Sequence, residues 1–137
     1  MFKNVLFPVD QSRESLEAAE VVANIVQKYG SRLILLSVIE ESPPEEGSPS
    51  PETMTSPEIV AELLKSAQAL FTQQGIDTET MSREGMPAFT ICDVADEIDA
   101  DLIVMGCRGL GLTEEGASES VTNRVINLSP CPVLVVP

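Results

Sequence analysis

The sequence has no histidine and only three cysteines, and each shortage excludes a class of functional site. Without histidine the chain cannot use a Ser-His-Asp or Cys-His catalytic apparatus, nor any metal site that depends on imidazole. Cys92, Cys107 and Cys131 are odd in number and have no Cys-x-x-Cys spacing. They fit a reducing compartment better than a disulfide framework or a zinc site.

Positive charge is also scarce. Lysine and arginine total 8 against 22 aspartates and glutamates, so the formal net charge is −14. Nucleic acids and anionic membranes attract clustered cations, and we therefore expect neither as a partner. No apolar run reaches the ~18 residues of a membrane span. The first ten residues meet Pro8 and Asp10 too early for a signal peptide, so we expect a cytoplasmic protein.

The hydrophobic fraction, in contrast, is ample. It amounts to 43% of 137 residues, with aromatics at only 4%, which predicts one domain over residues 1–137 with an aliphatic core. Residues 41–55 depart from this composition, because proline, serine and acidic residues leave no face that could join a core. They predict a flexible acidic surface loop. It is either a tolerated insertion or a segment that binds a partner or is modified.

Apolar runs and helical periodicities alternate along the chain. Short apolar runs predict strands at 4–9, 33–39, 102–105 and 133–136, and we expect the last of these at an edge of the sheet. A weaker alternation predicts a further edge strand at 76–83. Helical spacing predicts helices over about 12–29, from 56 to Gly75, after Pro87 and over about 120–128. The second helix has a stripe that we expect to be buried, formed by Val60, Leu63, Leu64, Ala67, Leu70 and Phe71. This alternation predicts an α/β fold: an open five-stranded parallel sheet with helices on both faces.

The connection after the strand at 102–105 is unusually long. Strand-to-helix turns in such sheets usually take ~2–6 residues, whereas this one runs from Gly106 to about Ser118. It has glycines at 106, 109, 111 and 116, where backbone could approach a ligand closely. Ligands of open α/β sheets bind beyond the carboxyl ends of the strands, so this loop is the candidate binding region.

Several polar residues are expected at the same edge. Asp10 could accept hydrogen bonds from a ribose, hold Mg²⁺, or simply cap a turn or helix. Gly106 and Gly109 could cradle phosphate oxygens with backbone N–H groups or form an ordinary turn. Ser120 and Thr122 begin the last helix, where they could help bind an anion or serve as N-caps. Arg108, together with Arg124, could balance an anion's charge or be solvated. Together these features describe a nucleotide-sized cleft.

Five stretches of the chain are similar to the universal stress protein family along nearly its whole length. They are VLFPVDQS (5–12), LILLSVIE (33–40), REGMP (83–87), ADLIVMGCRG (100–109) and SVTNRVINLSPCPVLVV (120–136). The resemblance implies a Rossmann-like fold of the adenine nucleotide alpha hydrolase type. It also implies a homodimer through the final strand, Val133–Val136, and, in one subgroup, ATP bound at the carboxyl edge of the sheet.

The resemblance to that subgroup also assigns candidate residues. Its pattern is Gly-x-x-Gly, nine residues, then Gly-Ser/Thr, and here Gly106, Gly109 and Ser120 match while Glu119 replaces a glycine. By resemblance, the end of the first strand contacts adenosine and ribose, Val38 meets adenine, and the two ends of the long loop hold the ribose and phosphates. The residues implied at these ends are Pro8, Val9 and Asp10, then Met105, Gly106, Arg108 and Gly109, then Ser120, Val121 and Thr122.

Glu119 leaves two functions open. A carboxylate ~4 Å from a phosphate would repel it by about 4 kcal/mol at an effective dielectric near 20, unless it points to solvent or binds Mg²⁺ with the phosphates. One hypothesis is therefore a dimeric stress protein that binds ATP or AMP, with or without Mg²⁺. The other is a stress protein that has lost the nucleotide and acts through protein–protein contacts. We expect enzymatic activity to be limited to slow ATP hydrolysis at most.

Overall fold

The computed structural model describes residues 2–9, 13–39, 57–106 and 121–137. Strands and helices alternate in them: β1 (Asn4–Pro8), α1 (Arg13–Tyr29), β2 (Arg32–Ile39), α2 (Pro57–Thr72), β3 (Thr78–Glu84), α3 (Pro87–Glu97), β4 (Leu102–Gly106), α5 (Val121–Leu128) and β5 (Val133–Val136). The predicted α/β class is confirmed. The loop predicted at 41–55 and most of the glycine-bearing loop lie outside the described residues.

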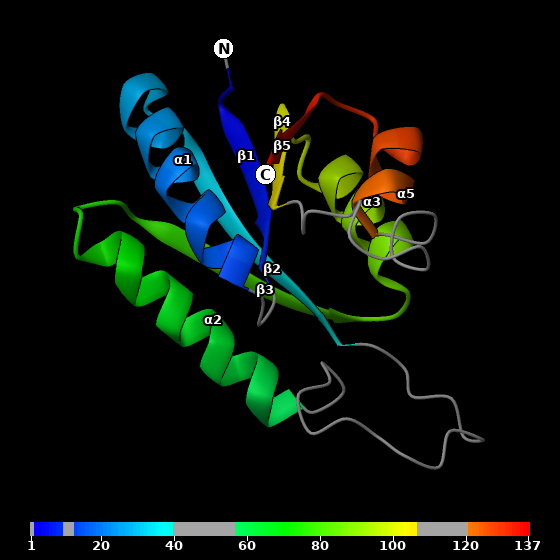
Figure 1. Ribbon diagram of the computed structural model, residues 1–137, viewed down its shortest axis with the longest axis horizontal. Helices are drawn as coiled ribbons and strands as arrows, with labels where there is room; N and C mark the ends of the chain where they lie inside the picture. The colour runs from blue at the N-terminus through cyan, green and yellow to red at the C-terminus, as the bar shows by residue number, and fades with distance from the viewer. Residues whose placement is uncertain (1, 10–12, 40–56, 107–120) are drawn as a thin grey trace.

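The five strands form one parallel sheet in the order β3-β2-β1-β4-β5. The chain places β2 and β3 on one side of β1 and then returns to place β4 and β5 on the other side (Figure 1). The direction in which the sheet is built therefore reverses between β1 and β4. The two strands predicted at edges of the sheet, β3 and β5, are both edge strands.

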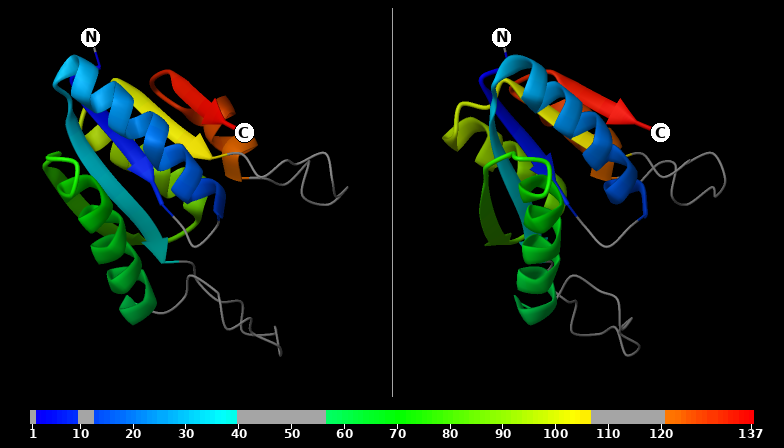
Figure 2. Two further views of the ribbon diagram at one scale, coloured as in Figure 1. Left: turned by 60° about the vertical axis from the view of Figure 1, so that its left-hand side comes forward. Right: turned by 90° about the vertical axis from the view of Figure 1, so that its left-hand side faces the viewer.

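Helices cover both faces of the sheet, as predicted. α1 and α2 lie on one face, and α3 and α5 lie on the other (Figures 1 and 2). Alternate residues of β1 divide between the two layers: Val5 and Phe7 join the core beneath α1 and α2, whereas Leu6 joins the core beneath α3 and α5. This alternation follows from the two-residue period of a strand.

Burial on both faces explains why the central strands read as continuous apolar runs. Residues 33–38 of β2 are all buried. Phe7 and Phe71 are each 1% exposed, and their rings meet edge to face, 6.2 Å apart at 87°, which joins β1 to α2. Gly30 and Gly75 have positive φ after α1 and α2, as predicted for residues that end helices.

The predicted stripe of α2 is partly wrong. Val60, Leu64, Ala67 and Phe71 are buried, but Leu70 is 39% exposed. At about 100° per residue, the buried positions lie within a narrow band and Leu70 projects roughly 90° from its centre. The sequence period locates the buried face correctly, yet the sheet covers less of that face than the apolar residues suggest.

At the edge of the sheet where the parallel strands begin, hydrogen bonds around Asn4 join β1 to the segment that precedes β4. The backbone N–H of Asn4 donates to a carboxylate oxygen of Asp101 at 2.9 Å, and the N–H of Asp101 donates to the Asn4 carbonyl at 2.8 Å. The Asn4 amide donates to the carbonyls of Ile98 and Asp99, each at 3.2 Å. These bonds join the start of β1 to the connection between α3 and β4. Among the described residues, no helix is long and apolar enough to cross a membrane.

Candidate functional site

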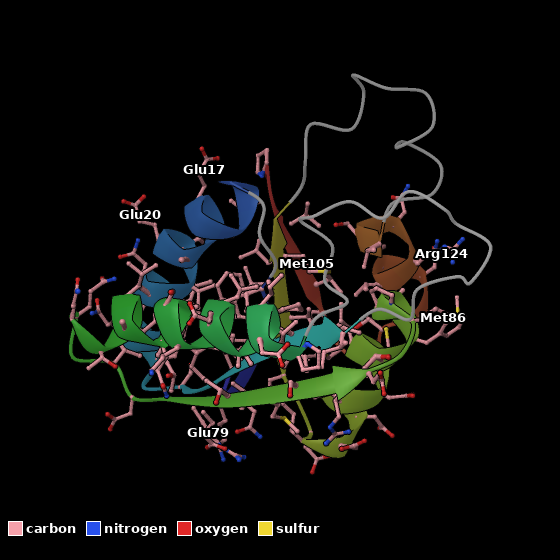
Figure 3. All side chains as sticks on the ribbon, turned by 90° about the horizontal axis from the view of Figure 1, so that it is seen from below. Glu17, Glu20, Glu79, Met86, Met105 and Arg124 are labelled. Atoms are coloured by element: carbon pink, nitrogen blue, oxygen red, sulfur yellow. The ribbon has the colours of Figure 1, made fainter. Side chains whose placement is uncertain are left out.

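The predicted site residues that the structure describes gather at the carboxyl ends of three neighbouring strands. Figure 3 shows this edge, with Met105 on β4 near the middle of the view and Arg124 on α5 to one side. The candidate site, as the name is used below, consists of Pro8 and Val9 after β1, Val38 on β2, Met105 and Gly106 on β4, and Val121 and Thr122 on α5. Asp10, Arg108, Gly109, Glu119 and Ser120 lie outside the described residues.

The end of β1 is held by β2 for one residue beyond the strand itself. Val9 donates its backbone N–H to the Leu36 carbonyl at 2.8 Å, and the Ser37 hydroxyl donates to the Val9 carbonyl at 3.0 Å. Ser37 is fully buried, and sequence reasoning assigned it no role. The signal was present, because Ser37 is the one polar residue within the apolar run at 33–39.

The floor of the candidate site is apolar. Val38 and Met105 are each 7% exposed, and their side chains join the core beneath α3 and α5. Met105 and Pro8 lie at the same level of the sheet, since each follows the paired residues Ile103 and Leu6 by two positions. A ligand at this edge would therefore meet the backbone and the side-chain ends of these residues.

The end of β4 and the start of α5 are joined by a side-chain hydrogen bond. The hydroxyl of Thr122 donates to the Gly106 carbonyl at 3.2 Å, and Thr122 is only 8% exposed. Val121, the first residue of α5, is 36% exposed. Backbone N–H groups at a helix start have no partner within the helix and favour anions. This corner of the site could therefore hold phosphate.

The arginines described in ion pairs have carboxylate partners, and the two described cysteines are partly or fully buried. The ion pairs Arg32–Glu79 and Arg83–Glu97 are exposed and link β2 to β3 and β3 to α3. Within the described residues, no cluster of three His, Cys, Asp or Glu side chains could hold a metal ion. Burial raises the pKa of the Cys131 thiol, which packs against the core beneath α3 and α5, consistent with a packing role. The site is suited to holding a ligand through backbone and apolar contacts.

Comparison with known sequences identifies the family. The model of the universal stress protein family matches residues 1–137. The chain is 66% identical over 137 residues to universal stress protein Sll1654 of Synechocystis sp.. The match covers 100% of this chain and 87% of that protein.

Solved structures agree on the fold. A universal stress protein in complex with cAMP has a TM-score of 0.79 at 26% identity, covering 99% of this chain and 97% of that one. A family member from Arabidopsis thaliana with AMP bound has a TM-score of 0.72 at 22% identity, covering 98% and 90%, and this likeness concerns the fold. The parallel five-stranded fold is shared with these solved structures, and the family model matches the whole length of the chain. The chain therefore belongs to the universal stress protein family.

Proposed function

We propose that this protein binds an adenine nucleotide, ATP or AMP, at the carboxyl edge of the sheet and acts as a homodimeric module in the response to stress. The observation that supports this most is the meeting of the ends of β1, β2 and β4 with the start of α5. It occurs where the strand order reverses between β1 and β4, the position at which open α/β sheets bind nucleotides. The related protein that holds cAMP has the same fold at 26% identity.

The base and the phosphates of such a ligand would contact different kinds of residue. Val38 and Met105 offer apolar contact for a base, since each has a small exposed part and they lie on the two strands that flank β1. Gly106 and Val121 offer backbone to phosphates, because one ends a strand and the other starts a helix. In the proposal, Pro8, Val9 and Asp10 contact the ribose side, and Arg108, Gly109, Ser120 and Thr122 belong to the phosphate side, with Mg²⁺ an accompanying ion.

Ligand-dependent thermal unfolding tests this proposal. A ligand at 100 times its Kd stabilises the folded state by about 2.7 kcal/mol, which for a chain of this size raises the melting temperature by several degrees. We expect such a rise with millimolar AMP or Mg-ATP. We expect a smaller rise with the same concentration of ribose phosphate, which lacks the base. The proposal is wrong if neither nucleotide changes the melting temperature and none is released when the purified protein is denatured.

Glu119 supports a second candidate function. A repulsion of about 4 kcal/mol would remove half of the ~8 kcal/mol of a micromolar complex, leaving a stress protein that acts through its surfaces. Glu119→Gly discriminates between the two, with Glu119→Gln as the matched control that keeps the side chain but removes its charge. Binding in the natural chain favours the nucleotide function. Binding that appears only in Glu119→Gly or Glu119→Gln favours the second.

The proposed dimer would form along β5. Among the residues that the structure describes, β5 pairs with β4 alone, and Leu134 is 36% exposed. The N–H of Ile103 donates to the Pro132 carbonyl, so by strand alternation the N–H and C=O groups of Val133 and Val135 point to the open edge. An apolar edge with unpaired backbone groups can pair with a second copy of itself.

Sedimentation velocity tests the dimer. Val135→Pro removes an N–H from the open edge and leaves the ladder to β4 intact, because proline is tolerated on the outer side of an edge strand. We expect the variant to sediment as a monomer with unchanged far-ultraviolet circular dichroism. Wild-type protein that sediments as a monomer, or a variant that stays dimeric, contradicts pairing through β5.

A further inference from the structure

Two buried hydroxyl groups lie at the candidate site. Within the described residues, Ser37 and Thr122 are the polar side chains that are buried, at 0% and 8% exposure. A hydroxyl removed from water is costly unless it is hydrogen-bonded, so buried hydroxyls are expected only where they have a partner. Each has one here, and in both cases the partner is the carbonyl of a residue at the end of a strand.

The two carbonyls belong to different halves of the site. Ser37 holds Val9, the residue that follows β1, and Thr122 holds Gly106, the last residue of β4. A carbonyl oxygen has a negative partial charge and would repel a phosphate if it faced the ligand. Hydrogen bonds from buried side chains keep both oxygens directed into the protein.

The bonds also fix where the chain leaves the sheet. Val9 is bonded to two consecutive residues of β2, since its N–H donates to Leu36 while its carbonyl accepts from Ser37. The bond from Thr122 to Gly106 joins residues 16 positions apart. Ordering these backbone positions before a ligand arrives lowers the entropic cost of binding.

We propose that Ser37 and Thr122 are positioning residues of the nucleotide site, Ser37 for its nucleoside half and Thr122 for its phosphate half. This inference rests on the proposed function. It assigns Thr122 a role other than phosphate ligand, because its hydroxyl proton is donated to Gly106. It also adds Ser37, which has no access to a ligand at 0% exposure.

Paired titrations with AMP and adenosine test the inference, because the two ligands differ by the phosphate. Thr122→Val keeps the shape of the side chain and removes its donor, and Thr122→Ser restores the donor. We expect Thr122→Val to weaken AMP binding about five- to tenfold and adenosine binding by less than about twofold, the loss expected for one hydrogen bond. Thr122→Ser should bind both ligands within about twofold of wild type.

Ser37→Ala should weaken AMP and adenosine by the same factor, since it acts on the half that both ligands share. Val26→Ala is the control for general destabilisation: Val26 is 4% exposed near the end of α1, and its carbonyl accepts from Ser31 just before β2, at the opposite edge of the sheet. It should leave both dissociation constants unchanged. If Thr122→Val fails to fold, Thr122→Ala makes the same deletion with a smaller side chain. Titrations followed by heteronuclear NMR can measure dissociation constants in the range of weak binding.

The outcomes separate the inference from the function on which it rests. Wild-type protein that binds neither ligand overturns the proposed function. Wild-type binding together with unchanged AMP affinity in Thr122→Val overturns only the positioning role. A Thr122 variant that weakens AMP and adenosine equally also overturns the role proposed for Thr122, because that role concerns the phosphate half, which adenosine lacks.

Discussion

Replacing Phe71 should test how firmly α2 is held against the sheet. Phe71 is 1% exposed and meets the ring of Phe7 edge to face, with centroids 6.2 Å apart. Truncating a buried phenylalanine to alanine costs about 3–5 kcal/mol, a third or more of the stability of many domains. For a chain of this size Phe71→Ala should lower the melting temperature by about 10–20 °C. Phe89→Ala, at a residue 50% exposed on α3, is the matched control and should cost far less.

A double-mutant cycle isolates the contribution of the ring pair. Phe7→Leu, Phe71→Leu and the double variant are unfolded in urea at one protein concentration, so that the proposed dimer, if it forms, affects all of them alike. Edge-to-face pairs contribute about 0.5–1.5 kcal/mol beyond their buried area, and the two single losses should exceed the double loss by that amount. Strict additivity would refute the reasoning, because it would mean that the two rings do not interact.

Three further predictions concern other parts of the structure. Asn4→Ala removes the side-chain hydrogen bonds to Ile98 and Asp99 and should cost about 1–2 kcal/mol in urea unfolding; an unchanged midpoint contradicts this. The hydrogen bond from Arg32 lowers the pKa of Glu79, so the pair stabilises the fold above the ordinary value of about 4.3, and this stabilisation is lost as the pH falls through the lowered pKa. Carbon-13 NMR should show a higher Glu79 midpoint in Arg32→Gln, and an equal midpoint would show that the pair does not form in solution. Burial, followed by the charge of Asp93, raises the pKa of Cys92. In a Cys107→Ser background iodoacetamide should therefore alkylate Cys92 slowly at pH 7.5 and rapidly in urea, and similar rates in both would count against burial.

The sequence predicted the type and order of the elements well because each has a strong local signal. The last strand was predicted at 133–136, which are its bounds in the structure, and α1 ends at Tyr29 before Gly30 as its glycine indicated. β3 begins two residues later than predicted, at Thr78, because its weak alternation gives a poorly defined start. Local pattern specifies a residue's own conformation, and it does so less sharply where the pattern is weak.

Neighbour relations were harder to predict. An apolar run shows that a strand is buried on both faces, but not which strand lies beside it, so the order β3-β2-β1-β4-β5 was not predicted. The same reason explains why Ser37 was missed: its role depends on Val9, 28 positions away in the sequence. Thr122 was placed at the site, but its bond to Gly106 could be seen only in the fold. The predicted roles of Asp10, Arg108, Gly109 and Ser120 remain predictions.

The central place of β1 has a consequence for how the chain is made. Of the five strands β1 is synthesised first, yet Asn4 contacts Asp101, which follows 97 residues later and directly precedes β4. At about 5–20 residues per second, a ribosome needs some 5–20 s to supply that second neighbour. Throughout that interval the side of β1 that later pairs with β4 is unpaired, and an unpaired apolar strand makes a nascent polypeptide prone to aggregate. A fragment released before β4 emerges should remain unfolded and be degraded quickly.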